Sequence, residues 1–436
     1  MRISTVRWLG VVAAVLVTPV LLALLGPQPQ RDVWTEVSVG LGFVALSFFI
    51  VQILSTMRTP RLTTRIGYDA ALRFHRAAAL VALTLVIAHP VILFVTDPRD
   101  RVLLNPASVP LRAWFGYAAL AGLLVLVGLS LGRARLRIRY ELWKTTHALL
   151  ATGILGASLV HVLRVGYYTD APAQRAFWMV VVLGAMAICT YQRFLRPRRL
   201  RRTPYRVAQV RAERGEAWTL ELRADGHDGR RFRPGQFAWL IFPGDGPLSA
   251  QEHPFSFASS ARAAAQPAFT VKELGNYTMA VKDVPSGTTV YLDGPHGAFC
   301  PDREDSTGFV FIGGGIGVTP IMCMLRTFAD RGDRGSHLLL YANRTWEDVV
   351  FREELVELRQ RLDLRVVHVL SHPHDEWDGP RGHLDAELLA EHLPPDHQSR
   401  QFFVSGPPGL ITAAEQALKE VGVPSNRVHL ESFSIV

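Results

Sequence analysis

Residues 73–96 read RFHRAAALVALTLVIAHPVILFVT, and residues 142–164 read LWKTTHALLATGILGASLVHVLR. Each stretch is long and apolar enough to cross a membrane as a helix, which needs about 20 such residues. Each also carries two histidines fourteen residues apart, His75 with His89 and His147 with His161. Fourteen residues of α-helix lift a side chain about 21 Å and return it to within about 40° of the same face. The spacing therefore predicts histidines at two depths of one helix bundle.

These are the only four histidines in the first 200 residues, although the whole chain has 15. Ionisable side chains at membrane depth are usually functional, because burying them in lipid is costly. Haem iron accepts axial histidine, so two neighbouring helices could hold two stacked haems, each clamped by one histidine from either helix. The alternative is a bundle in which the histidines are isolated polar residues.

Six apolar stretches in the first 200 residues are candidate membrane spans. They are residues 8–26, 33–56, 73–96, 112–132, 142–164 and 175–195. The first resembles a secretory signal without an obvious small-x-small cleavage pattern, so we expect an uncleaved anchor. The sequence thus predicts a multi-pass protein of the plasma (inner) membrane, with the lipid bilayer as its surroundings.

Lysine and arginine gather in every second connection, at 57–76 and 133–144, and again after the last span, at 193–202. Basic residues are enriched on the cytoplasmic side of membranes, so we expect both termini to be cytoplasmic. This orientation pairs His75 with His147 for an inner b-type haem and His89 with His161 for an outer one.

The bulk composition excludes several classes of protein. A length of 436 residues predicts two or three domains. The net charge of +9 comes largely from arginine beside the apolar runs, and no basic stripe with interleaved aromatics indicates a nucleic-acid partner. The three cysteines lack paired spacing, which argues against a disulfide framework, a zinc site or a four-cysteine cluster.

Residues 204–302 alternate in short β-like runs between glycine and proline turns, which predicts a small antiparallel barrel. The runs are Tyr205–Arg211, Ala217–Arg223, Gln236–Phe242 and Ala268–Glu273. Among them lie HPFS at 253–256 and KELGNYT at 272–278. An aromatic ring can cover a flavin, a hydroxyl can bond a ring nitrogen, and a lysine can meet a phosphate. Alone, either motif could be an ordinary turn.

From Gly308 the pattern changes to alternating strands and helices. The apolar run Phe309–Ile312 leads into GGGIGVTP at 313–320 and an apolar helix over 321–330. A glycine-rich turn between strand and helix lets main-chain N–H groups approach a pyrophosphate. The further strands are His337–Ala342, Leu364–Leu370 and Gln401–Val404. The alternation predicts a parallel sheet, with Ser405-Gly406-Pro407 at its ligand-binding edge.

The order of these motifs resembles the ferric reductase/NADPH oxidase superfamily, and the soluble half resembles ferredoxin–NADP reductase-type flavoproteins. The resemblance covers the chain from about the second span to its end. It implies a multidomain fold with a six-helix transmembrane di-haem bundle at 1–200. It also implies an antiparallel β-barrel that binds FAD at 203–303 and a Rossmann-like α/β domain that binds NAD(P) at 306–436.

The resemblance also implies roles for single residues. Phe255 would lie against the flavin ring and Ser256 would contact its reactive edge. Ser405 stands where many relatives have cysteine, and Phe433 is the candidate for a C-terminal aromatic over the flavin. The other residues implied to bind cofactors are His253, Pro254, Lys272, Gly275 and Thr278 for FAD, Gly313, Gly314, Gly315, Gly317, Thr319 and Pro320 for the dinucleotide pyrophosphate, and Gly406 and Pro407 near the nicotinamide. Arg344 could bind a 2′-phosphate, which would favour NADPH.

By this resemblance the chain is expected to be a flavocytochrome b that passes electrons from cytoplasmic NAD(P)H through FAD and two haems to an extracytoplasmic acceptor. Ferric chelates are the first candidate acceptor, molecular oxygen giving superoxide is the second, and a periplasmic protein is the third. The competing hypotheses are a membrane sensor or transport protein with a vestigial flavin domain, and a flavin reductase with a mere anchor. The local cluster of His368, His372 and His374 is expected to be a solvated loop rather than a metal site.

Overall fold

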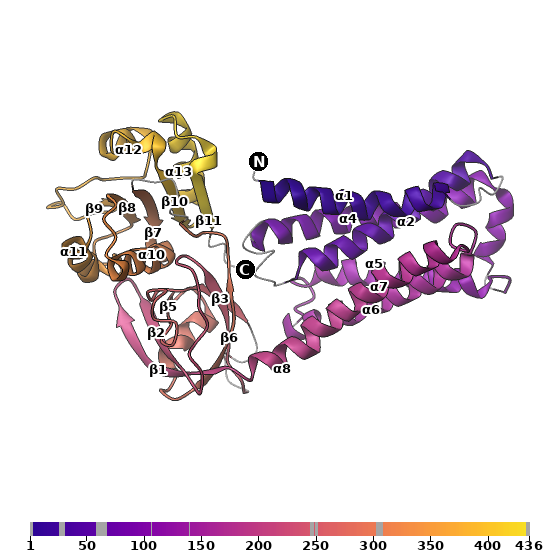
Figure 1. Cartoon of the computed structure of the whole chain (residues 1–436), viewed down its shortest axis with the longest axis horizontal. Helices are drawn as coiled ribbons and strands as arrows, with labels where there is room; N and C mark the ends of the chain where they lie inside the picture. The colour runs from indigo at the N-terminus through magenta and orange to yellow at the C-terminus, as the bar shows by residue number, and fades with distance from the viewer. Residues whose placement is uncertain are drawn as a thin grey trace. The chain divides into compact units, whose positions relative to one another are not determined.

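The computed structural model of the chain describes residues 3–25, 31–57, 68–105, 107–138, 140–244, 248, 252–301 and 308–432. The chain forms two compact units, Met1–Arg199 and Leu200–Val436 (Figure 1). A further division of the second unit into a barrel and an α/β domain, with bounds 203–303 and 306–436, stays a prediction.

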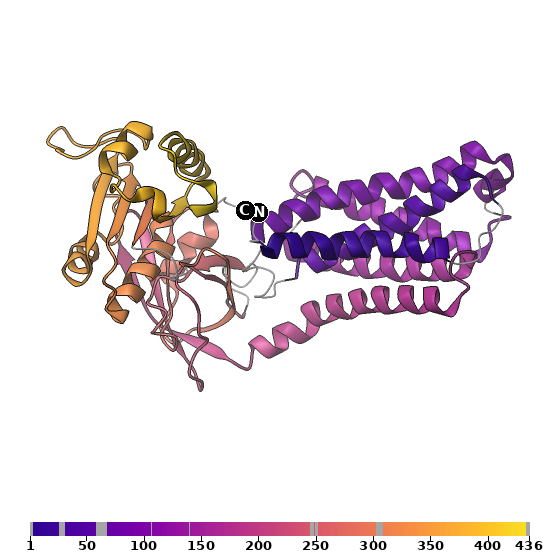
Figure 2. The same ribbon diagram turned by 45° about the horizontal axis from the view of Figure 1, so that its top comes forward.

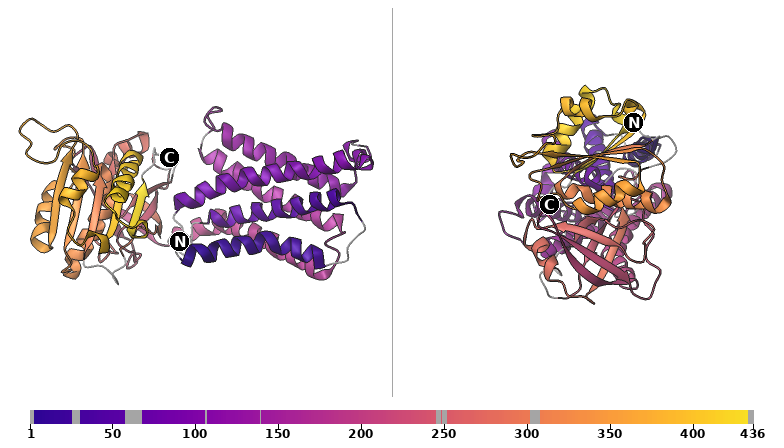
Figure 3. Two further views of the ribbon diagram at one scale, coloured as in Figure 1. Left: turned by 90° about the horizontal axis from the view of Figure 1, so that it is seen from above. Right: turned by 90° about the vertical axis from the view of Figure 1, so that its left-hand side faces the viewer.

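The first unit consists of long apolar helices that lie side by side (Figure 3). They are α1 Ile3–Leu25, α2 Val33–Ser55, α4 Tyr68–Thr96, α5 Leu111–Gly132, α6 Tyr140–Val165 and α7 Pro172–Thr190. Helix α7 continues through the π-helical turn Tyr191–Leu195 into α8, Arg196–Leu200 (Figure 2).

Five helices of the described residues are long and apolar enough to cross a membrane. They are Val33–Ser55, Ala70–Thr96, Leu111–Gly132, Leu142–Val165 and Pro172–Leu200. The apolar part of α1, Val12–Leu24, is shorter than these five spans. The structure thus supports five candidate spans, and the sixth, predicted over residues 8–26, stays a prediction.

The burial of side chains explains how these helices are stable together. Val180 on α7 is 72% exposed and Val95 on α4 is 67% exposed. Apolar surfaces of this kind are unfavourable in water but suit the hydrocarbon of a bilayer. Helix α2 is different, because Ile50 and Val51 are buried and the helix packs along α4. Half of the apolar window of α2 is thus buried, whereas its neighbours keep largely exposed apolar faces.

The second unit begins with a six-stranded antiparallel sheet in the order β4-β3-β6-β1-β2-β5. The strands are β1 Pro204–Glu213, β2 Ala217–Ala224, β3 Phe237–Ile241, β4 His253–Ser256, β5 Ala268–Lys272 and β6 Thr289–His296. Phe257, the residue directly after the edge strand β4, forms one isolated bridge with Phe269 of the other edge strand, β5. The antiparallel sheet agrees with the prediction, whereas its closure into a barrel stays a prediction.

A five-stranded parallel sheet follows in the order β11-β10-β7-β8-β9. Its strands are β7 Phe309–Gly314, β8 His337–Asn343, β9 Leu364–Leu370, β10 Gln401–Gly406 and β11 Val428–Ser432. Its helices are α10 Val318–Arg331, α11 Arg352–Arg361, α12 Ala386–His392 and α13 Pro408–Glu420. The strand order reverses between β7 and β10, which are neighbours.

Both faces of the parallel sheet are covered by helices (Figure 1). Phe309 and Phe311 of β7 pack in the core formed with α10 and α11. Val310 and Ile312 of the same strand pack on the opposite face with α12 and α13. Successive side chains of a strand point to opposite faces, so a strand buried on both faces reads as one continuous apolar run.

Candidate functional site

Helices α4 and α6 bring the four membrane histidines together in two pairs. The ring centroids of His75 and His147 are 6.3 Å apart, and those of His89 and His161 are 6.4 Å apart. Two imidazoles that share one metal ion through bonds of about 2.0 Å place their centroids about 6.3 Å apart. Both pairs have the separation that such ligation requires. They are also the two pairs predicted from the membrane orientation of the spans. Their role as ligands stays a prediction.

Hydrogen bonds at Nδ1 orient both rings of the His89–His161 pair. Nδ1 of His89 lies 2.8 Å from the main-chain oxygen of Ser38 on α2. Nδ1 of His161 lies 2.8 Å from the main-chain oxygen of Arg112 on α5. A carbonyl oxygen only accepts, so both Nδ1 atoms carry the proton and donate it. This tautomer leaves the lone pair of each Nε2 free for a metal.

His147 obtains the same tautomer from a side chain. Its Nδ1 lies 3.2 Å from Oγ of Ser130 on α5. The Ser130 hydroxyl donates to the main-chain oxygen of Leu126 at 2.7 Å and accepts from Nε1 of Trp143 at 3.3 Å. Because the hydroxyl proton is already donated, Nδ1 of His147 can only be a donor. His75 differs, since its buried Nδ1 has no hydrogen-bond partner among the described residues.

Two glycines let neighbouring helices approach the outer pair. A Cβ atom on Gly116 of α5 would lie 3.0 Å from Nδ1 of His161. A Cβ atom on Gly42 of α2 would lie 3.5 Å from Nδ1 of His89. Any larger side chain at Gly116 would crowd the ring, so the small residue brings the α5 main chain close enough to supply its carbonyl acceptor.

The HPFS motif forms strand β4 and not a turn. The ring centroid of His253 lies 4.0 Å from that of Tyr277 on α9 (Asn276–Met279). The ring of Phe255 stacks on Tyr277 with the centroids 6.2 Å apart. Burial holds the pKa of His253 below its usual value and raises the pKa of Tyr277 well above its own. Both side chains are therefore neutral at physiological pH, and the cluster offers an aromatic surface to a planar ring.

Ser256 has the chemistry of a ligand contact. It is 3% exposed, and its Oγ has no hydrogen-bond partner within the described part of the chain. A buried hydroxyl without a partner is unfavourable by about 1–3 kcal/mol. A bound group with a complementary polar atom would remove that cost. Pro254, two residues earlier, is exposed.

Thr278 and Lys272 make contacts within the chain. The Thr278 hydroxyl accepts from the main-chain N–H of Leu274 at 2.8 Å and of Gly275 at 3.0 Å, and thus closes the start of α9. Nζ of Lys272 forms an ion pair with Asp348 at 3.8 Å. Their predicted contacts with FAD stay predictions.

The glycine-rich segment lies where the strand order of the parallel sheet reverses. Strand β7 ends at Gly314, a 3-10 turn spans Gly315–Gly317, and α10 begins at Val318. Strand β10 lies alongside, with Ser405 opposite Gly313. Ligands of open parallel sheets bind at the carboxyl edge at such a reversal. The structure thus brings together two motifs that are about 90 residues apart in the sequence.

Two glycines of this turn are required for different physical reasons. Gly315 has a φ of +52°, and a Cβ there would meet nothing within 4 Å, so its main chain is open to a ligand. A Cβ on Gly317 would lie 2.5 Å from the main-chain oxygen of Ser405, so no larger residue fits. The Thr319 hydroxyl donates to the oxygen of Ile316 at 2.8 Å and closes the turn.

The remaining predicted residues of this edge are arranged as follows. Ser405 is fully buried, and its Oγ has no hydrogen-bond partner among the described residues. Gly406 ends β10, and Pro407 precedes α13. Pro320 is buried in the first turn of α10. Phe433 lies outside the described residues.

Arg344 follows β8 directly, with an exposed side chain. The three histidines of the local cluster have separate neighbours: His368 lies 5.0 Å from the ring of Trp346, His372 contacts Ser371, and His374 contacts Glu347. Over the described ranges, no group of three or more histidine, cysteine or acidic side chains is placed to hold a metal ion.

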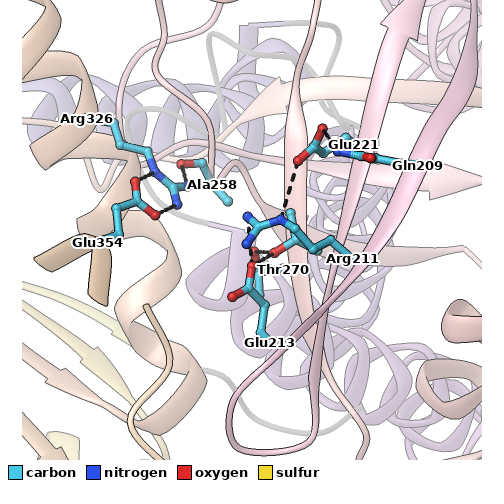
Figure 4. A network of polar contacts seen from close by, with 9 residues as sticks. Gln209, Arg211, Glu213, Glu221, Ala258, Thr270, Arg326 and Glu354 are labelled. Carbon is cyan, nitrogen blue, oxygen red and sulfur yellow. Dashed lines mark hydrogen bonds and ion pairs between the residues drawn. The ribbon is translucent and has the colours of Figure 1, made fainter. Parts of the chain in front are cut away.

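Arg326, which sequence reasoning missed, joins the helix after the glycine-rich turn to the segment that follows the Ser256 strand, β4. Its guanidinium contacts both oxygens of Glu354 on α11, at 2.6 and 2.5 Å (Figure 4). It also donates to the main-chain oxygen of Ala258 at 2.5 Å. A two-point pair of this kind fixes orientation as well as distance. Arg326 therefore holds α10 against the segment that leaves β4.

Two families have sequence models that match the chain. Residues 41–158 match the ferric reductase like transmembrane component, and residues 311–416 match the oxidoreductase NAD-binding domain. The chain thus joins a ferric reductase-like transmembrane component to an oxidoreductase NAD-binding domain. The predicted resemblance to the ferric reductase superfamily and to ferredoxin–NADP reductase-type proteins is thereby confirmed.

The chain is similar to curated reductase components. It is 30% identical over 209 residues to the glycine betaine monooxygenase reductase subunit of Chromohalobacter salexigens, which covers 46% of this chain and 56% of that protein. It is 33% identical over 208 residues to the ferredoxin reductase component of 3-ketosteroid-9-alpha-monooxygenase of Rhodococcus rhodochrous, covering 47% and 56%. The chain spans about half the length of these relatives.

Among solved structures, flavohemoglobin from Malassezia yamatoensis with bound FAD and heme is similar to this chain in fold. The TM-score is 0.51 at 15% identity, over 92% of this chain and 99% of that one. The flavohem-like FAD/NAD-binding domain of nitric oxide dioxygenase from Vibrio cholerae covers 53% of this chain and 98% of its own, at 22% identity and a TM-score of 0.48.

Proposed function

We propose that this oxidoreductase carries electrons across a membrane, from NAD(P)H on the cytoplasmic side through FAD and two b-type haems to an acceptor on the other side. Ferric chelates are the proposed acceptor. One observation carries the proposal: the same two helices hold two facing pairs of histidines, with ring centroids 6.3 and 6.4 Å apart.

When bound, FAD supplies hydride chemistry and haem supplies single-electron transfer, and the protein supplies ligation, distance and electrostatics. The four histidines would hold the two haems, one facing pair for each, and haem would supply single-electron transfer there. Ser38, Arg112 and Ser130 hold three of the rings in the tautomer that ligation needs. Outward movement of an electron is favoured by an inside-negative potential, by about 2.3 kcal/mol per 100 mV.

The second unit offers residues for the flavin and for the dinucleotide. The buried Oγ atoms of Ser256 and Ser405 each lack a partner among the described residues, as expected of groups that bond a ligand. Phe255 would cover the flavin ring, and the open main chain of Gly315 would approach the pyrophosphate. Arg326 would hold α10, which follows the glycine-rich turn, at a fixed distance from the segment that follows β4.

Inverted vesicles with a ferric chelate trapped inside test this function. NAD(P)H added outside should reduce the trapped chelate in the absence of oxygen. Reduction of external chelate alone would indicate a flavin reductase with an anchor, and a preparation without a Soret band would indicate a sensor or transport protein. Aeration should leave chelate reduction in place; if electrons pass to oxygen as superoxide instead, oxygen is the acceptor.

Replacing Phe255 with alanine should weaken retention of FAD. An aromatic stacking contact adds about 0.5–1.5 kcal/mol to the area that it buries, which is up to about tenfold in affinity. The flavin content of the purified variant, measured after dialysis, checks this. Phe255→Tyr keeps the ring and should keep the flavin. An Ala variant with the flavin content of the wild type would contradict the stacking role.

Replacing Arg344 with alanine should lower the preference for NADPH over NADH. A hydrogen bond to a charged group contributes about 1.5–3 kcal/mol, so loss of a 2′-phosphate contact predicts a fall of tenfold or more in relative kcat/KM. Steady-state rates with both coenzymes measure it. Arg359→Ala removes an equal charge from the exposed side of α11 and serves as the control. Equal effects of the two variants would exclude a specific role of Arg344.

A further inference from the structure

The two histidine pairs differ in whether their rings reach main-chain oxygens directly. In the outer pair each Nδ1 reaches a main-chain oxygen at 2.8 Å, that of Ser38 for His89 and that of Arg112 for His161, and Oγ of Ser38 also lies 2.9 Å from Nδ1 of His89. Leu126 stands fourteen residues beyond Arg112 on α5, so its carbonyl lies on about the same face, at the depth of His147. By the pattern of the outer pair, that carbonyl would be the acceptor for His147.

In the inner pair a hydroxyl is interposed. The Leu126 oxygen accepts from Ser130 at 2.7 Å, and His147 donates to Ser130 Oγ at 3.2 Å. The other ring of this pair has no hydrogen bond on its Nδ1 among the described residues, since the carbonyl of Gln52 faces His75 without reaching hydrogen-bond geometry. Within the described part of the chain, Ser130 is thus the one acceptor that the inner pair contacts at Nδ1.

This difference has a chemical consequence. A metal-bound histidine that donates its Nδ1–H to an acceptor becomes a more basic ligand. A more basic ligand stabilises the oxidised, more positively charged iron, and so lowers the reduction potential. Donation by Ser130 to Leu126 polarises the hydroxyl oxygen and makes it a better acceptor, because hydrogen bonds in a chain strengthen one another.

We propose that Ser130 is a positioning residue that sets the reduction potential of the inner haem through His147. The inference rests on the proposed function of the four histidines as haem ligands. A side-chain acceptor can be removed by mutation, whereas the main-chain acceptors of the outer pair remain in any variant. One substitution should therefore change the inner site alone.

The test compares midpoint potentials from spectroelectrochemical titration of the purified full-length protein. Wild type, Ser130→Ala and Ser130→Thr are titrated, and His89→Ala, which should keep only the inner haem, identifies the inner component. Thr152→Val is the matched control, because the Thr152 hydroxyl lies on the same helix as His147 and donates to Ala148 at 2.9 Å. Electron paramagnetic resonance of the oxidised protein reports the ligand field independently.

We expect Ser130→Ala to shift the inner component to a more positive potential and to leave the outer one in place. Ser130→Thr keeps a hydroxyl and should retain both wild-type potentials, as should Thr152→Val. Unchanged potentials in Ser130→Ala, or an equal shift in Ser130→Thr, overturn the inference while the haem assignment stands. Absence of haem from the wild type overturns both. If Ser130→Ala does not retain the haem, Ser130→Cys, whose sulfur is a weak acceptor, takes its place, and an unchanged potential there overturns the inference.

Discussion

Replacing His89 with alanine should abolish reduction of a trapped ferric chelate, while reduction of the flavin by NAD(P)H persists. His89 and His161 would hold one group between them, with ring centroids 6.4 Å apart, so the loss of either ring removes that group. Loss of a mere supporting contact lowers metal affinity or activity by about 10–100-fold, so loss of a ligand should lower transmembrane transfer by more than about 100-fold. The ratio of haem to flavin should fall by half.

The vesicle assay and the Soret absorbance of the same preparation measure this result together. Val91→Ala is the control, since Val91 lies on α4 two residues after His89 and is half exposed on the apolar surface. His161→Ala should have the effect of His89→Ala, and the double variant should be no worse than either, because the two residues act as a unit. Full transmembrane activity in His89→Ala would refute the assignment of the outer site.

The pairing of the membrane histidines could be predicted because an α-helix has a fixed rise and rotation per residue. Fourteen residues fix both rise and face, so His75 and His89 needed only a partner helix with the same spacing. The acceptors behind the rings were not predictable, because the meeting of a given ring and carbonyl depends on how two helices are packed. A signal existed nevertheless: Ser38 and Gln52 are also fourteen residues apart on the neighbouring span.

The second unit shows the same limit. The continuous apolar run of β7 was predicted, since burial on both faces leaves a clear pattern. Strand β11, Val428–Ser432, was missed, because it forms the edge of its sheet and its sequence carries polar residues. Strand β4 was read as a motif that could be a turn, although it pairs with β3. The contact of Arg326 with Ala258 spans 68 residues, and no local pattern encodes it.

Replacing Gly317 with alanine should lower the rate of flavin reduction by NAD(P)H about 100-fold. The new Cβ would lie 2.5 Å from the oxygen of Ser405 and 2.6 Å from Cα of Gly406, and both neighbours are main chain that cannot rotate away. The glycine-rich turn and the end of β10 must therefore separate. A displacement of about 1 Å in a reacting pair can cost about 100-fold in rate. Stopped-flow measurement of flavin bleaching checks the effect.

Gly332→Ala separates this effect from a simple loss of stability. Gly332 ends the same helix, α10, with a φ of +64°, and a Cβ there would meet nothing within 4 Å. Alanine at that position is strained by about 1 kcal/mol, yet it leaves the turn in place. Gly332→Ala should therefore lower the melting temperature and keep flavin reduction near the wild-type rate.

In Gly317→Ala, chemical reduction of the flavin should restore electron flow to the haems, because the step that the substitution impairs comes before flavin reduction. A Gly317→Ala variant that NAD(P)H reduces at the wild-type rate would mean that the dinucleotide does not bind where the strand order reverses.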